Sequence, residues 1–277
     1  MTTWTGTTGT TGTTPGTTTE TGSEAGNATG IETGAGGGAD VAVLALAAVQ
    51  LTEPDPAEAP LTPAELLRAG AFAVPAVQRR FLAARQAARR FVAGLADVDP
   101  AMVTADYQCP ECGAAATQSH GVPRYQVQGR TVPFQVSFSR SGQWLLAGAT
   151  AAGPLGVDLA DLAGFGDPRL DAVIATDAEQ ARYDVVAPAS RALRQARLWT
   201  RKEAVLKASG DGLRTAPHLV EVGVEAGMDS TVAVGPAGDR VFIIDLDTRM
   251  LGLPTGLLAA AAVPAAGGIR IERRGWN

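Results

Sequence analysis

The chain has 277 residues, 45% of them hydrophobic, which is enough for one large domain or two smaller halves with an apolar core. No apolar run approaches the roughly 18 residues that a transmembrane helix needs, and the N-terminus lacks a secretory signal, so we expect a cytoplasmic protein outside the membrane. The net charge is −5, but residues 1–60 carry seven acids and no Lys or Arg, which leaves +2 for the rest and too little positive charge for nucleic-acid binding.

The N-terminal part of the chain divides into a tail and an ordered region. Residues 1–38 form a Thr/Gly-rich tract with almost no core-forming side chains, and we expect it to be disordered because it cannot bury enough apolar surface. A strand is predicted at residues 41–49. The sequence Thr-Pro-Ala-Glu at residues 62–65 predicts a helix start, with a capping box and a proline at the first helical position. A longer helix is predicted at residues 75–93, with arginines beside its apolar face.

The rest of the chain mixes strands and helices. Strands are predicted at residues 134–138, 144–150 and 156–159. Helical segments follow near residues 168–174 and 190–209. Further strands are predicted at residues 219–224, 231–234, 241–246 and 257–263. This order indicates an α+β fold, with two strand-plus-helix halves joined near Gly153.

The most informative segment is the predicted helix around residues 198–207. On a helix, Trp199, Glu203 and Lys207 fall on one face. This face carries an apolar side chain for the core, a carboxylate and an ammonium group. Alone, a Glu–Lys pair at this spacing is most often a surface pair that stabilises the helix. Asp158 lies at the end of an apolar strand and can share a cation with Glu203. Mg²⁺ takes few carboxylates and completes its shell with water and phosphate oxygens.

These motifs resemble the 4′-phosphopantetheinyl transferase superfamily, surfactin-synthetase-activating type. The pattern W-x-x-K-E-A-x-x-K at residues 199–207 is followed by G-x-G and preceded, some forty residues earlier, by G-V-D. Four upstream segments are also similar: S-F-S-R-S-G to the family's N-[IVL]-S-H-S-G turn, H-G-V-P to its H-G-K-P loop, an arginine-rich helix, and a degraded F-S-x-x-E, at residues 137–142, 120–123, 80–89 and 175–179. The resemblance covers about residues 40–265.

The resemblance implies an enzyme that moves the 4′-phosphopantetheine group of coenzyme A to a serine of an acyl, peptidyl or aryl carrier protein, releasing 3′,5′-ADP. It implies a pseudo-twofold fold with coenzyme A between two halves, residues 39–153 and 154–277, and with Mg²⁺ as the cofactor. Asp158 and Glu203 would hold Mg²⁺, Glu203 would also help to deprotonate the serine, and Lys207 would stabilise charge on the pyrophosphate. The residues expected to bind coenzyme A are Arg80, Gly121, Pro123, Ser139, Arg140 and Lys207. Of these, Arg80 and Ser139 would contact its phosphates, and Gly121 and Pro123 would line its nucleotide. We expect a monomer.

Three positions depart from the family pattern. Ala160 stands where the family has a second acid, Arg140 where it has a histidine, and Val122 where it has a lysine. Water can replace a missing ligand, and an arginine can still contact a phosphate. Asp161 is one position away from the missing acid and is expected to point the other way if the strand continues. These departures leave open a catalytically impaired homologue that binds coenzyme A or a carrier protein without transfer.

A zinc-dependent interaction protein is a further alternative. Cys109 and Cys112 form a C-x-x-C pair, and a closed zinc site would need His120 and one more ligand. One such pair favours a loop remnant over a metal site, and two cysteines in all are too few for a disulfide framework. His218 has no visible partner in the sequence and is interpreted as a structural histidine.

Overall fold

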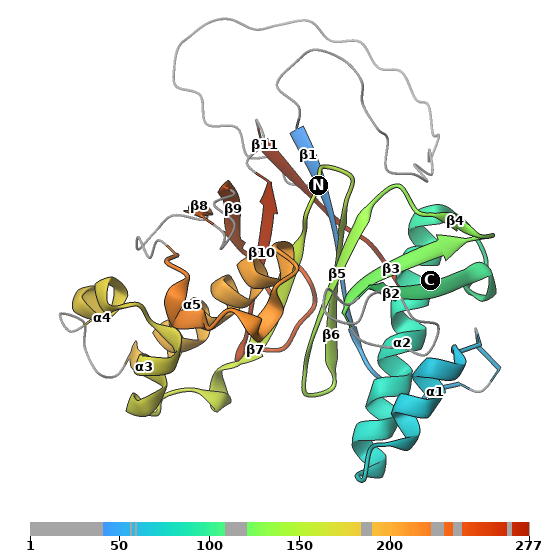
Figure 1. Ribbon diagram of the computed structural model, residues 1–277, viewed down its shortest axis with the longest axis horizontal. Coiled ribbons are helices and arrows are strands. Elements are labelled where there is room, and N and C mark those ends of the chain that lie inside the picture. The colour runs from blue at the N-terminus through green and yellow to red at the C-terminus, as the bar shows by residue number, and fades with distance from the viewer. Residues whose placement is uncertain are drawn as a thin grey trace, which may run out of the picture.

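Helices and strands build a mixed α/β protein (Figure 1). The computed structural model describes residues 41–55, 57–58, 60–108, 121–183, 190–222, 230–234, 240–264 and 268–276. The predicted disordered tail, residues 1–38, lies outside the described residues.

The elements follow one another from β1 to β11. The strands are β1 (Val41–Gln50), β2 (Val103–Gln108), β3 (Val122–Val127), β4 (Arg130–Thr131), β5 (Gln135–Ser141), β6 (Trp144–Thr150), β7 (Gly156–Asp161), β8 (Ser230–Val234), β9 (Arg240–Asp245), β10 (Leu257–Pro264) and β11 (Gly268–Arg273). The α-helices are α1 (Pro63–Gly70), α2 (Pro75–Ala96), α3 (Asp171–Ile174), α4 (Asp177–Tyr183) and α5 (Arg191–Ala208). Short 3₁₀ helices are η1 (Pro100–Met102), η2 (Leu162–Gly164), η3 (Pro168–Leu170), η5 (Gly212–Arg214) and η6 (Pro217–Leu219).

The strands form three sheets. The first has the order β11-β1-β6-β5, the second β7-β10-β9-β8 and the third β2-β3-β4. All pairings are antiparallel except that of β1 with β11, which is parallel. The last strand of the chain therefore returns to the first sheet, beside the strand with which the described chain begins.

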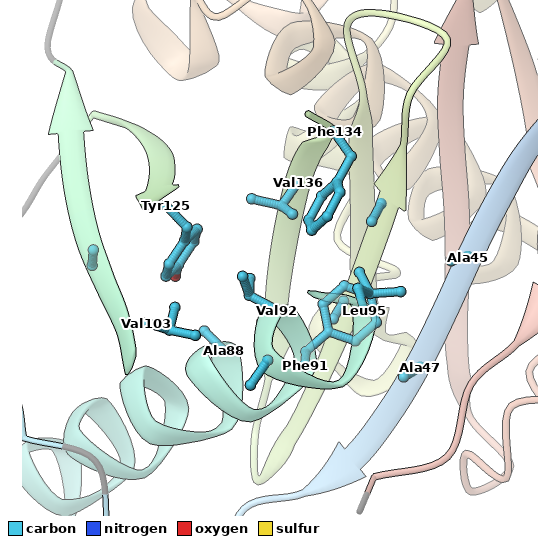
Figure 2. Packing of buried hydrophobic residues seen from close by; sticks show 14 of the residues in the cluster. Ala45, Ala47, Ala88, Phe91, Val92, Leu95, Val103, Tyr125, Phe134 and Val136 are labelled. Carbon is cyan, nitrogen blue, oxygen red and sulfur yellow. The ribbon is translucent and has the colours of Figure 1, made fainter. Parts of the chain in front are cut away.

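Alternating side chains of β1 explain how the sheets pack. Leu44 and Leu46 point to one side and join a core shared with β7 and β10 of the second sheet. Ala45 and Ala47 point to the other side, toward Phe91 and the rest of the apolar face of α2 (Figure 2). A strand with two buried faces needs apolar residues at every position, as the run in β1 provides.

Helix α5 covers the outer face of the second sheet. Ala260 and Ala262 of β10 face a core that includes Leu198, Val205 and Leu206 of α5. Small alanine side chains on the strand allow the helix axis to come close to the sheet. Helices α2 and α5 therefore lie on opposite sides of the two packed sheets (Figure 1).

Most predicted elements are confirmed, and one is wrong. The capping box at Thr62 is present, and the helices and strands predicted between residues 134 and 209 are all found. The predicted strand at residues 219–224 is not a strand in its described part. Pro217 begins the 3₁₀ helix η6, and the N–H groups of Val220 and Val222 donate to Pro217 O and to the Glu179 carboxylate, so neither joins a sheet.

Candidate functional site

Two serines of β5 join the two four-stranded sheets at their edges. The N–H of Val157 donates to Ser137 Oγ at 3.0 Å, and the N–H of Leu159 donates to Ser139 Oγ at 3.1 Å. Residues two apart on a strand point to the same side, so both hydroxyls face β7. This side-chain seam, Ser137 and Ser139 against β7, sets the position of β7 relative to the first sheet.

Gly156 lets α5 lie directly on β7. A Cβ atom at this glycine would lie 1.7 Å from the carbonyl oxygen of Ala204, so no other residue fits without moving the helix. Asp158 follows two residues later and therefore points to the same side, toward α5. The close approach brings Glu203 and Lys207, one helical turn apart, to this aspartate.

Asp158 is almost fully buried and uses only one of its oxygens. Its Oδ1 accepts from Ser139 Oγ at 2.7 Å and from Lys207 Nζ at 2.6 Å. Lys207 Nζ also donates to the carbonyl oxygen of Val157 at 3.0 Å. Within the described part of the chain, Asp158 Oδ2 is buried and has no hydrogen-bond partner.

Glu203 is a second buried carboxylate beside Asp158. Glu203 is only 8% exposed, and its Oε1 has no hydrogen-bond partner among the described residues. Burial raises the pKa of Glu203, the positive charge of Lys207 lowers it, and the negative charge of Asp158 raises it, with a net upward shift. Two neighbouring carboxylates each thus present an oxygen that nothing in the described structure satisfies.

These two carboxylates fit a hard divalent cation whose other ligands are water molecules and substrate oxygens. The described residues contain no group of three or more His, Cys, Asp or Glu side chains that could hold a metal. The face of β7 explains this, because Ala160 is buried on the same side as Asp158 and supplies no oxygen. Asp161 is exposed, as expected for the opposite side, and its Oδ1 accepts from the Ala163 N–H at 2.9 Å. Two carboxylates with water and phosphate oxygens suit Mg²⁺.

A cleft of about 750 Å³ is lined by Lys207, which pairs with Asp158, while Asp158 and Glu203 themselves are not among its lining residues. Of the residues predicted to bind coenzyme A, Gly121, Pro123 and Lys207 line it, and Lys207 thus belongs both to the cleft and to the carboxylate pair. Ser139 is not among the lining residues but reaches Asp158. The cleft has the size of an ordinary small-molecule site.

Arginines gather next to the cleft. The pKa of Arg140 is lowered by burial and by the positive charges of Arg80 and Arg85, which shows that strand β5 and helix α2 bring the three together. Arg85 lines the cleft, and its guanidinium lies 4.7 Å from the ring centre of Tyr107 and 4.8 Å from that of Phe81. An arginine remains protonated under such conditions, so the cluster offers several positive charges to one anion.

Sequence reasoning missed several residues of the cleft. Tyr107 comes from β2, which was not predicted, and Ser137 and Arg214 also line the cleft. The alternation of Ser137 with Ser139 could have indicated Ser137, because both serines fall on one side of a predicted strand. No local pattern marks Tyr107 or Arg214. Cys109, Cys112 and His120 lie outside the described residues, and His218 is exposed on η6.

The carboxylate pair and Lys207 lie in a segment that is similar in sequence to a protein family. Residues 154–243 match the model of the 4′-phosphopantetheinyl transferase superfamily. The match supports this superfamily, and with it phosphopantetheine transfer in general, for the segment that carries β7 and α5. No curated protein matches the chain. None of the helices in the described part of the chain has the length and apolar character needed to cross a bilayer.

Proposed function

We propose that this protein transfers the 4′-phosphopantetheine group of coenzyme A to a serine of a carrier protein and releases 3′,5′-ADP. One observation carries the proposal. Asp158 and Glu203 each keep one buried oxygen without a partner in the described structure, beside Lys207, which lines the cleft. Acids and a lysine placed so next to a cleft suit phosphoryl transfer, where catalysis is mostly positioning and charge neutralisation.

In the proposed reaction, the oxygen of the carrier serine forms a bond to the β-phosphorus of coenzyme A. The bond between this phosphorus and the bridging oxygen breaks, and 3′,5′-ADP leaves with that oxygen. Glu203 takes the serine proton, directly or through a water, and its raised pKa makes it a stronger base than an ordinary glutamate. Lys207 places a positive charge beside the pyrophosphate.

We propose that Asp158 and Glu203 hold Mg²⁺, which when bound would neutralise charge on the pyrophosphate. The hydrogen bond from Ser139 fixes the orientation of Asp158, as outer-shell partners of metal ligands commonly do. Arg80 and Arg140 would contact phosphates of coenzyme A, and their mutual repulsion supports this role, because a bound anion relieves it.

We further propose that the fold is pseudo-twofold, as in the surfactin-synthetase-activating type. Two fully buried ion pairs support this. Glu65 of α1 pairs with Arg89 of α2, and Glu179 of α4 pairs with Lys202 of α5, both at 2.5 Å. In each case a threonine three residues before the glutamate caps its helix, and acid and base are 24 or 23 residues apart.

The proposed halves are residues 39–153 and 154–277, with β11 returning from the second to complete the first sheet. A single chain with both halves contains both sides of the proposed site, so we propose a monomer. We also propose that the protein is cytoplasmic. Carrier proteins of polyketide, peptide-synthetase or fatty-acid pathways are all proposed substrates.

Binding without transfer is the second candidate. Ala160 removes a third oxygen from the carboxylate pair, and Lys207 already occupies one oxygen of Asp158. A protein with these features can bind coenzyme A and yet hold the metal too weakly for chemistry.

Mass spectrometry of carrier proteins separates the two candidates. The protein is incubated with coenzyme A, Mg²⁺ and a panel of apo carrier proteins. Transfer predicts that at least one carrier gains the mass of one phosphopantetheine, and that Glu203→Gln abolishes the gain. Glu221→Gln is the matched control, because Glu221 is half exposed and pairs only with Arg182 in the described structure. Coenzyme A binding without any mass gain would contradict transfer.

A further inference from the structure

We infer that Arg214 is an additional residue for the nucleotide half of coenzyme A, an inference that rests on the proposed function. Among the described residues, three basic side chains line the cleft, namely Arg85, Lys207 and Arg214. Lys207 is held at the carboxylate pair, at 2.6 Å from Asp158. Arg214 comes from η5, beyond the end of α5, and no motif assigns it a role.

The guanidinium of Arg214 is held in place by its own turn. Its Nε donates to the carbonyl oxygen of Asp211 at 3.0 Å, and Nη2 donates to that of Gly210 at 3.0 Å. The side chain is 40% exposed, and Nη1 has no hydrogen-bond partner in the described structure. A guanidinium that is already held in place loses little conformational freedom when it binds a phosphate, and Arg214 both lines the cleft and keeps one nitrogen unpartnered in the described structure.

The turn lies against the wall at which the nucleotide is expected. A Cβ atom at Gly210 would lie 3.6 Å from a methyl group of Val122, between the predicted nucleotide-binding residues Gly121 and Pro123. Val122 brings no charge to this wall. Arg214 supplies a cation next to it from the other half of the chain.

The negative charge of Asp211, beside Arg214, opposes the binding of a phosphate. Its presence makes the inference testable. Asp211 also lines the cleft, and its carboxylate lies 3.3 Å from Nη2 of Arg214. If the pair served only to stabilise the turn, loss of either partner would disturb binding in the same direction. If charge in the cleft is what matters, loss of Arg214 weakens the binding of an anion and loss of Asp211 strengthens it.

The test measures binding of 3′,5′-ADP by titration calorimetry at low salt. We expect Arg214→Gln to raise its Kd about fivefold to tenfold, Arg214→Lys to keep most of the affinity, and Asp211→Asn to lower the Kd. Binding of 4′-phosphopantetheine, which lacks the nucleotide, is expected to stay the same in all three variants. Arg249→Gln is the control, because Arg249 forms a similar local pair with Asp247 at 3.3 Å and does not line the cleft.

Failure of the inference can be told from failure of the proposed function. If the wild-type protein binds coenzyme A but Arg214→Gln binds 3′,5′-ADP equally well, the inference alone is wrong. Weaker binding in both Arg214→Gln and Asp211→Asn also overturns it, because that result assigns the pair a structural role. If the wild-type protein binds neither coenzyme A nor 3′,5′-ADP, the inference and the proposed function both fall.

Discussion

Gly156→Ala tests whether the contact between α5 and β7 positions the site. The new Cβ atom would lie 1.7 Å from the carbonyl oxygen of Ala204 and 2.8 Å from the nitrogen of Ala208. A carbon atom and an oxygen atom in contact need about 3.3 Å, so the helix must move away by roughly 1.5 Å. Overpacking of this kind costs about 1–3 kcal/mol of unfolding free energy. The same shift stretches the 2.6 Å bond between Lys207 and Asp158 beyond hydrogen-bonding range.

We therefore expect Gly156→Ala to lower the free energy of unfolding by about 2 kcal/mol in urea denaturation. Because a misplacement of about 1 Å can cost about 100-fold in rate, phosphopantetheine transfer is expected to fall by at least that factor under conditions where the variant is folded. Gly164→Ala is the matched control, since a Cβ at Gly164 meets nothing within 4 Å. Wild-type stability together with wild-type transfer in Gly156→Ala would refute the reasoning.

Three further changes act on the carboxylate pair. Lys207→Met frees an oxygen of Asp158 and removes a competing cation, so calorimetry should show a Kd for Mg²⁺ about tenfold lower, while transfer is lost. Ala160→Asp adds a third acid on the same face and is expected to tighten Mg²⁺ binding by about tenfold; an unchanged Kd would contradict the assigned face. Burial raises the pKa of Glu203, so the ionised form destabilises the fold; without metal, Glu203→Gln should raise the denaturation midpoint at pH 7 and converge with the wild-type protein as both become neutral below pH 4.

Local signals in the sequence predicted the elements that carry the site. Helix α5 was found from its spacing and its flanking residues, and the capping box at Thr62 from a four-residue pattern. The pairing of Asp158 with Glu203 was predicted from an acid at the end of an apolar strand and an acid on one face of a helix, together with the resemblance to the family. Gly156 belongs to the same motif, but only the structure reveals that α5 contacts its backbone.

Local sequence signals could not predict which strands pair over long distances in the chain. Strand β11 pairs in parallel with β1, more than 200 residues away in the chain, and no local sequence pattern predicts this pairing. Residues 219–224 were predicted as a strand, yet in their described part a buried carboxylate and a proline direct the backbone elsewhere. The cluster of Arg80, Arg85 and Arg140 arises only when α2 packs on the first sheet.

The adjacent residues Lys202 and Glu203 explain how one helix can anchor and present a site at once. Lys202 is fully buried and donates to Glu179 and to the carbonyl oxygens of Ile174 and Pro217. A buried ion pair adds little net stability compared with an apolar pair of the same shape, but three fixed acceptors hold the helix at one rotation. Glu203 is the next residue and points, by the helical advance of about 100°, toward Asp158 instead. The rotation set by Lys202 and the close approach allowed by Gly156 together determine where the carboxylate of Glu203 lies.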